Sequence, residues 1–252
     1  MGTDRVTAAL TARARELWEF LAESGAGFAP AVRVAVSPGS ALCPPGWVGI
    51  VVLGDAALAT APDPGSARLV EQALGSLPTA SLTDAYVLRT RLPVAAILGP
   101  ASLAYLDPAE FRPQPGDTAI TPLDMADPGF RQLVLAADPG EVAESGIEEI
   151  TTSAFSFREH GQVVAAAGYR DWPRGTAQLS VLTAAAARDR GLARAVASAA
   201  VAHAIAEGRL PQWRARPLAS RRVARALGFR ELGLQVSFRL VNSPAWASAS
   251  AR

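Results

Sequence analysis

Three strand-like runs in succession, residues 151–161, 162–172 and 176–183, constrain the fold of this chain more than any other feature. Their apolar and polar residues alternate, and glycine or proline separates one run from the next, which predicts a meander of antiparallel strands. A long helical pattern follows from about residue 191 and ends at Gly208. A meander that continues into a long helix predicts an α/β fold for this part of the chain.

The rest of the chain also mixes helical and strand-like patterns. In the first half, residues 6–24 and 63–77 have helical spacing, while residues 31–38 and 47–54 resemble strands. Residues 106–118 are rich in proline and acidic residues, which indicates a linker or a long crossing loop. In the second half we expect strands at 118–124, 210–216 and 231–240, and helices at 126–138, 139–150 and 218–229.

These patterns predict two lobes and a tail. Residues 1–112 are expected to form a smaller N-terminal α/β lobe of unknown role, and residues 113–241 a second lobe with a mixed, mostly antiparallel sheet. Residues 242–252 are small and polar, and we expect a flexible tail.

The composition excludes several kinds of site. All 24 basic residues are arginine, so a Walker lysine or a Schiff-base lysine is impossible. The single cysteine, Cys43, excludes an internal disulfide and a cysteine-based zinc site, and neither His160 nor His203 lies in a zinc-binding pattern. We therefore expect no metal. The net charge of +1 gives no drive toward nucleic acids or membranes, and the absence of a signal-like or membrane-spanning run predicts a cytoplasmic protein.

The six residues RDRGLA stand where the long helix begins. The first turn of a helix has unpaired N–H groups and a positive dipole end, and therefore binds phosphate readily. Gly191 lets the backbone approach an anion closely, and Arg194 extends the positive field. The segment is therefore a candidate pyrophosphate-binding loop, which we call the cradle. The start of an ordinary solvent-exposed helix could have the same sequence. The members of the cradle are Arg188, Asp189, Arg190, Gly191, Leu192 and Ala193.

Residues 117–240 resemble the GNAT superfamily of acyl-CoA-dependent N-acyltransferases. The superfamily's Q/R-x-x-G-x-G/A motif is matched by residues 188–193, and residues 220–233, SRRVARALGFRELG, are similar to its last helix and the turn into its final strand. The segment PQWRAR, which places a tryptophan before the last helix, resembles the branch of the superfamily that includes zwittermicin-resistance acetyltransferases. The resemblance implies a GNAT-like second lobe, and the N-terminal lobe is compatible with a degenerate copy of the same fold.

The resemblance also implies a mechanism. Acetyl-CoA would lie between two splayed strands, with its pyrophosphate on the amides of residues 188–193. The backbone of Val181, Leu182 and Thr183 would pair with the pantetheine arm. A neutral amine would attack the thioester directly, which calls for a base, an oxyanion donor and an acid. The predicted activity is acetyl transfer from acetyl-CoA to a primary amine. We expect a small-molecule acceptor, such as a small amine or an aminoglycoside, and a peptide N-terminus or a protein lysine are the alternatives.

Three positions depart from the family's pattern. The familiar tyrosine acid is replaced by Ala224, the asparagine at the head of the last helix by Pro217, and the glutamate on the strand before the loop by Gln178. These losses put the usual acid and base in doubt. They also motivate the alternative of an acyl-CoA sensor or scaffold without catalysis; a third hypothesis is another phosphorylated ligand.

Candidate replacements for the missing acid and base lie within the segment that resembles the family. Glu149, with Glu148 beside it, lies near the expected acceptor site and could bind a cationic amine, or it could be a solvated helix-end charge. Ser220 could hydrogen-bond near the thiolate, although capping the last helix is the simpler expectation. The acidic residues between 141 and 149 slightly favour a cationic small molecule.

Other side chains are expected to be structural. His160 is expected in a surface turn, His203 packed or half exposed, Trp213 in the core and Cys43 as a small buried hydrophobe. Tyr169 and Asp171 could reach the cleft or belong to a turn. The N-terminal lobe could shape the acceptor pocket or provide the surface of a homodimer.

Overall fold

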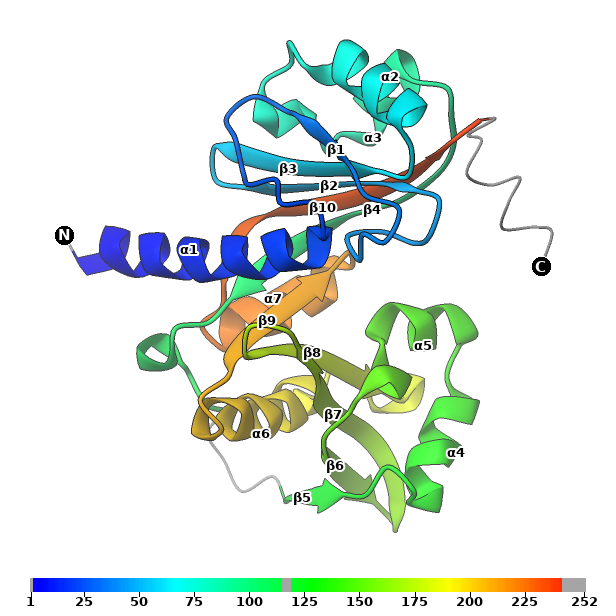
Figure 1. Cartoon of the computed structure of the whole chain (residues 1–252). Coiled ribbons are helices and arrows are strands. Elements are labelled where there is room, and N and C mark those ends of the chain that lie inside the picture. The colour runs from blue at the N-terminus through cyan, green and yellow to red at the C-terminus, as the bar shows by residue number, and fades with distance from the viewer. Residues whose placement is uncertain (1, 115–118, 242–252) are drawn as a thin grey trace. The chain divides into compact units, whose positions relative to one another are not determined.

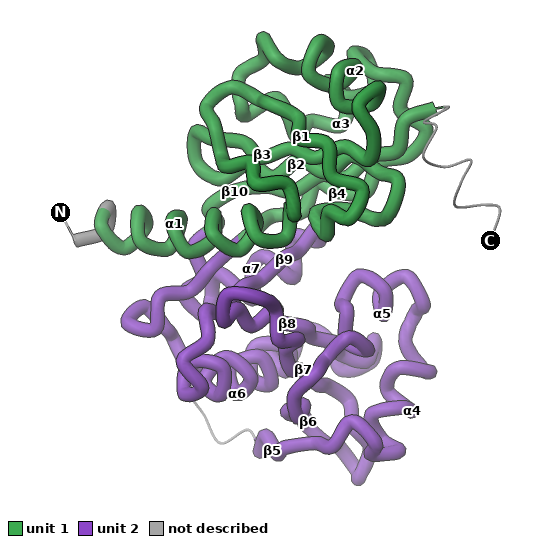
Figure 2. Tube along the Cα trace, viewed as in Figure 1, with its two compact units in different colours: residues 1–103, 231–252 green, residues 104–230 purple. Residues whose placement is uncertain are grey.

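The computed structural model describes residues 2–114 and 119–241, which form two compact units (Figure 2). One unit comprises Met1–Leu103 with Glu231–Arg252, and the other comprises Ala104–Arg230. The predicted flexible tail, residues 242–252, lies outside the described residues. The units divide the chain after residues 103 and 230 rather than at the predicted residue 112, and the final strand, predicted in the second lobe, falls in the first unit. That strand belongs to the first unit because it pairs with residues 48–53 there.

The first unit is a sheet with helices on both faces. Its strands follow the order β1-β3-β2-β10-β4, in which β1 and β3 are parallel and β2 is antiparallel to both β3 and β10. Every residue of β2 and β3 is buried, because α1 and α2 cover the two faces (Figure 1). The elements are α1 (Gly2–Ala22), β1 (Val34–Val36), β2 (Val48–Leu53), β3 (Ala56–Ala61), α2 (Pro64–Leu74), α3 (Ala85–Arg91), β4 (Val94–Tyr105) and β10 (Arg230–Leu240).

The second unit contains the predicted meander. Strands β5 to β8 pair with their neighbours in antiparallel fashion, and β9 joins β8 in parallel. This mixed, mostly antiparallel sheet confirms the predicted fold class. The elements are β5 (Ile120–Leu123), α4 (Pro128–Ala136), α5 (Pro139–Ser145), β6 (Ala154–Glu159), β7 (Gln162–Trp172), β8 (Thr176–Thr183), α6 (Leu192–Ala206), β9 (Leu210–Ala215) and α7 (Leu218–Ala226), with the short 3-10 helix η3 (Ile147–Glu149) after α5.

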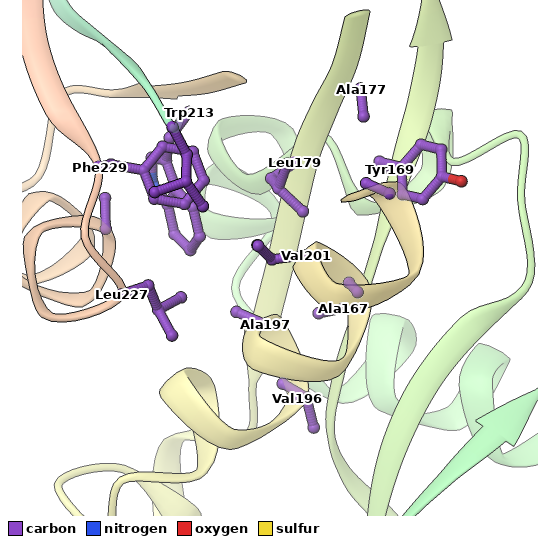
Figure 3. Close-up of a cluster of buried hydrophobic side chains, with 14 of the residues drawn as sticks. Ala167, Tyr169, Ala177, Leu179, Val196, Ala197, Val201, Trp213, Leu227 and Phe229 are labelled. Carbon is purple, nitrogen blue, oxygen red and sulfur yellow. The ribbon is translucent and has the colours of Figure 1, made fainter. Parts of the chain in front are cut away.

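Helices cover both faces of the sheet that β5 to β9 form within the second unit. Helix α6 packs across β6 to β9 on one face, and α7 contacts α6 and β9, while α4 and α5 contact β7 and β8 on the other. Small side chains let α6 approach the strands closely, because Ala197 and Ala200 are fully buried against Ala165 and Ala167 of β7. Figure 3 shows Trp213 and Phe229 together at one end of this cluster and Tyr169 at the other.

The turn between α7 and β10 depends on Gly228. Its φ of +100° is a conformation that side-chain-bearing residues rarely adopt, and an added Cβ would overlap the carbonyl oxygen of Glu110. The amide of Arg112 donates to the Leu227 carbonyl beside it, at 3.0 Å. The segment from Glu110 to Arg112 is therefore packed directly against this turn.

We predict that Gly228→Ala destabilises the second unit by about 3 kcal/mol or more, because backbone strain and a steric overlap add. Gly175→Ala is the matched control, since Gly175 has φ +65° but open space around it, and strain alone should cost about 1–2 kcal/mol. Denaturant unfolding of both variants measures the difference. Equal losses would show that the contact with Glu110 is unimportant.

Candidate functional site

Strands β8 and β9 pair along only part of their length. Pairing joins Thr176–Gln178 to Leu210–Gln212 and stops there. Residues 179–183 of β8 still pair with β7, so only their β9-facing edge is left out of the sheet. The backbone groups of a free strand edge are available to a ligand that can hydrogen-bond to them.

A cavity of about 770 Å³ opens where the two strands separate. Leu179 and Trp213, which line it, belong to the core on the α6 side, whereas Leu182 belongs to the core on the α4 and α5 side. The cavity therefore reaches both faces of the sheet through the gap between β8 and β9. Its walls are α5, the second half of β8, residues 187–191, the first turn of α6, the end of β9 and the start of α7.

The N-terminus of α6 faces this cavity without a side-chain cap. Gly191 is the cap residue, with φ +76° and ψ +1°, and nothing would lie within 4 Å of a Cβ there. The first backbone bond of the helix runs from the Ala195 amide to the Gly191 carbonyl, at 3.1 Å. The amides of Leu192 and Ala193 therefore have no acceptor among the described residues. This arrangement provides unpaired donors and a positive helix end, as an anion site requires.

Arginines surround the cavity, and only some of them are neutralised. Arg188 pairs with Glu141, and Arg216 pairs with Glu144, both carboxylates being on α5. Arg194 and Arg222 also line the cavity, yet neither has an ion pair within residues 2–114 and 119–241. Two uncompensated guanidinium groups thus accompany the uncapped helix start.

The predicted cradle lines the cavity, except for one side chain. Arg190 does not line it, because its guanidinium bonds to both oxygens of Glu159 on β6, at 2.7 and 3.1 Å. This contact lowers the pKa of Glu159. The chain turns at Asp189, whose φ is +60°, so Arg188 and Arg190 leave the loop toward different partners. The members that do line the cavity are Val181, Leu182, Thr183, Arg188, Asp189, Gly191, Leu192, Ala193 and Arg194.

The two candidate catalytic residues lie in different surroundings. Glu149 does not line the cavity; its carboxylate pairs with Arg170 at 2.8 Å on an exposed surface. Ser220 does line it, and its Oγ accepts a hydrogen bond from Nε1 of Trp213 at 2.9 Å. The expectation that Ser220 caps the last helix was wrong, because α7 begins at Leu218 after Pro217 and has no side-chain cap.

Gln178 stands at the strand position where the family has a glutamate, and its side-chain amide pairs with that of Gln212. Nε2 of Gln212 donates to Oε1 of Gln178 at 2.9 Å, just before the two strands separate. Gln212 is fully buried, and its own Oε1 has no hydrogen-bond partner among the described residues. An amide pair can hold a polar group here but cannot take up a proton at neutral pH.

Other singled-out side chains have structural roles. The Tyr169 hydroxyl lies 3.0 Å from Nδ1 of half-buried His203, and burial raises the tyrosine's pKa. Tyr169 does not line the cavity. Asp171 pairs with Arg209 at 3.4 Å, outside the cavity. Trp213 is buried against Phe229, as expected.

Two further expectations concern residues outside the site. His160 lies in the turn between β6 and β7, as expected. Cys43 of the first unit is only partly buried; burial nevertheless raises the pKa of its thiol to about 12.

Several residues that line the cavity were not predicted from the sequence. Arg214 and Arg216 alternate with the buried Trp213 and Ala215, so the strand pattern already placed them on the opposite face. Arg222 lies two residues after Ser220 in α7, where two successive arginines were a visible signal. Glu141 and Glu144 are three residues apart on α5 and therefore share one helix face.

Within residues 2–114 and 119–241, no group of three or more His, Cys, Asp or Glu side chains could hold a metal ion. In the same part of the chain, no helix is both long and apolar enough to span a bilayer.

Solved structures with similar folds include several GNAT proteins. An acetyltransferase from the GNAT family of Novosphingobium aromaticivorans is 24% identical over 57% of this chain and 65% of its own, with a TM-score of 0.46. This chain thus spans less than two thirds of that protein. A GNAT-family acetyltransferase from Colwellia psychrerythraea is 16% identical over 77% and 81%, with a TM-score of 0.48. YncA from Salmonella typhimurium, solved with acetyl-CoA, is 21% identical over 50% and 95%, with a TM-score of 0.35.

No curated protein matches the chain. Residues 155–233, however, match the family model for GNAT acetyltransferase. The match runs from β6 to the beginning of β10, and so includes the separating strands, the α6 N-terminus and α7. In this segment the chain is similar to the GNAT acetyltransferase family.

Proposed function

We propose that this protein transfers the acetyl group of acetyl-CoA to the primary amine of a small molecule. The observation that carries the proposal is the through-sheet cavity, in which a free strand edge, an uncapped helix start and two uncompensated arginines occur together. Acetyl-CoA has an extended pantetheine arm, whose amides can hydrogen-bond to the free strand edge. Its charged phosphates fit the uncapped helix start and the two arginines. The family match at residues 155–233 supports acetyl transfer in general.

The chemistry follows from the surroundings of the point where β8 and β9 separate. A neutral amine attacks the thioester carbon, the carbon–sulfur bond breaks, and the thiolate of CoA leaves. Because Gln178 cannot act as a base, the proton of the new ammonium group passes to water. The enzyme then contributes mainly by positioning the reactants and by stabilising the leaving sulfur.

Ser220 is our candidate for stabilising the leaving thiolate. The indole Nε1–H of Trp213 can only donate, so the Ser220 oxygen is the acceptor of their hydrogen bond. The hydroxyl hydrogen of Ser220 is therefore directed away from Trp213 and can be donated to a ligand in the cavity. Trp213 is buried against Phe229, which fixes the position of the hydrogen-bond donor.

We predict that Ser220→Ala lowers kcat about tenfold or more and leaves the dissociation constant of acetyl-CoA unchanged, because only the leaving thiolate uses this hydrogen bond. Ser145→Ala is the control: its hydroxyl also lines the cavity but already donates to the Val142 carbonyl at 2.8 Å. Thiol release measures both. Equal effects of the two substitutions would exclude this role.

The anion site predicts which arginines hold CoA. Arg194→Gln and Arg222→Gln should each raise the dissociation constant of CoA about tenfold, since each removes a charge-assisted contact of roughly 1.5 kcal/mol or more. Arg190→Gln, in the same loop, should change it less than about twofold, because Arg190 is held by Glu159. Calorimetric titration gives the three constants, and a large effect of Arg190→Gln would contradict the site as described.

Thermal unfolding tests acetyl-CoA binding itself. A hundredfold excess over the dissociation constant should stabilise the folded protein by about 2.7 kcal/mol. Gly191→Glu should abolish the gain, because it adds a negative charge at a cap position with φ +76°. Stabilisation by simple nucleotides equal to that by CoA would favour another phosphorylated ligand instead.

A second candidate function is acyl-CoA binding without catalysis. It is favoured by the residues that replace the family's acid and base, namely Ala224, Pro217 and Gln178. Such a binder would be stabilised by CoA yet release no thiol with any amine. The similarity to the zwittermicin-resistance branch, the role of the N-terminal lobe and a homodimer stay predictions.

A further inference from the structure

Helix α5 is joined to other elements around the cavity by two ion pairs. Its Glu141 pairs with Arg188 of the cradle, and both side chains line the cavity. Its Glu144 pairs with Arg216, which follows β9, and these two side chains line the cavity as well. Two guanidinium groups that a ligand in the cavity could contact are therefore already held by carboxylates.

The two arginines differ in what lies beside them. Arg188 belongs to the loop that leads into Gly191, where α6 begins without a side-chain cap, and both residues line the cavity. Arg216 lies between β9 and α7 instead. An anion bound to the amides at the α6 N-terminus is therefore close to Arg188 in the chain, and its charge attracts that guanidinium. Glu141 is the carboxylate with which such an anion has to compete.

The pair between Glu141 and Arg188 is easily exchanged. The two side chains are 42% and 43% exposed, so water and salt screen their attraction. The buried residue of α5 is Val142, and Glu141 can therefore move away without disturbing the core. A phosphate group accepts two parallel hydrogen bonds from a guanidinium group, and a pyrophosphate carries more negative charge than one carboxylate. A ligand with a pyrophosphate can thus take Arg188 from Glu141.

Resting on the proposed function, we propose that Glu141 competes with the pyrophosphate of acetyl-CoA for Arg188. In the free protein the carboxylate holds the guanidinium group. On binding, Arg188 exchanges this carboxylate for phosphate oxygens, and the loss of the ion pair lowers the net affinity. After acetyl transfer the ion pair forms again, which favours the release of CoA. Glu141 is thus an autoinhibitory contact that keeps the product from staying bound.

Variants at Glu141 test the competition by calorimetric titration with CoA. Glu141→Gln should lower the dissociation constant about fivefold, because the phosphates then no longer have to displace a carboxylate. Glu141→Asp keeps the negative charge but is one methylene shorter, so the ion pair is weakened, and the dissociation constant should fall at least about twofold. A gain with glutamine but none with aspartate would show that repulsion of the ligand, and not the ion pair, limits the affinity, and would overturn the inference.

A double variant tests whether Glu141 acts through Arg188. Arg188→Gln alone should raise the dissociation constant of CoA only about twofold, whereas in the Glu141→Gln background it should raise it about tenfold. Equal effects in the two backgrounds would contradict the competition. Glu144→Gln is the matched control, since Glu144 lies on the same helix and pairs with Arg216. It should change the constant less than about twofold, and a gain equal to that of Glu141→Gln would also contradict the competition.

Two ligand experiments complete the test. Dephospho-CoA keeps the pyrophosphate but lacks the 3′-phosphate, and Glu141→Gln should bind it about fivefold more tightly as well. A gain that is lost with dephospho-CoA would mean that Glu141 competes with the 3′-phosphate, and the inference fails. In a thiol-release assay, product inhibition by CoA should strengthen by the same factor in Glu141→Gln. The absence of CoA binding in the parent protein and in every variant overturns the proposed function too, whereas CoA binding that ignores Glu141 overturns this inference alone.

Discussion

The cavity of the second unit depends on one interaction, the backbone hydrogen bonding between β8 and β9, which extends over only part of the two strands. Strands β8 and β9 pair over three residues each and then separate, while β8 stays fully paired with β7 on its other edge. A sheet normally satisfies its backbone groups internally, so a gap between two strands exposes donors and acceptors that a ligand can use. The cavity, the access from both faces and the position of the expected reaction centre all follow from this separation.

The local charge around the cavity of the second unit depends on which arginines form an ion pair with a carboxylate. Arg188 and Arg190 are two residues apart, yet one lines the cavity beside Glu141 and the other is held by Glu159 on β6. Arg194 and Arg222 line the cavity without an ion pair among the described residues. Since the chain has almost equal numbers of basic and acidic residues, local pairing rather than net charge sets the sign of the site.

Neutralised carboxylates change the chemistry expected of the acceptor. Glu149 was a candidate base, but its exposed carboxylate pairs with Arg170 and does not line the cavity. Ser220 lies in the cavity, and Trp213 fixes which way its hydroxyl donates. Of the two candidate catalytic side chains, only that of Ser220 therefore lies where a ligand in the cavity could contact it.

The sequence by itself determined the local elements. Alternation predicted β6, β7 and β8, helical spacing together with Gly208 predicted α6, and residues 188–193 marked the start of that helix, because these signals depend only on neighbouring residues. The uniformly buried β3, with its run of small apolar residues, lacked alternation and was missed. Tertiary structure alone decided that β10 pairs with β2, that β8 and β9 separate after Gln178, and that Arg190 turns away from the cavity. Each of these depends on a partner distant in sequence, whose identity no local pattern specifies.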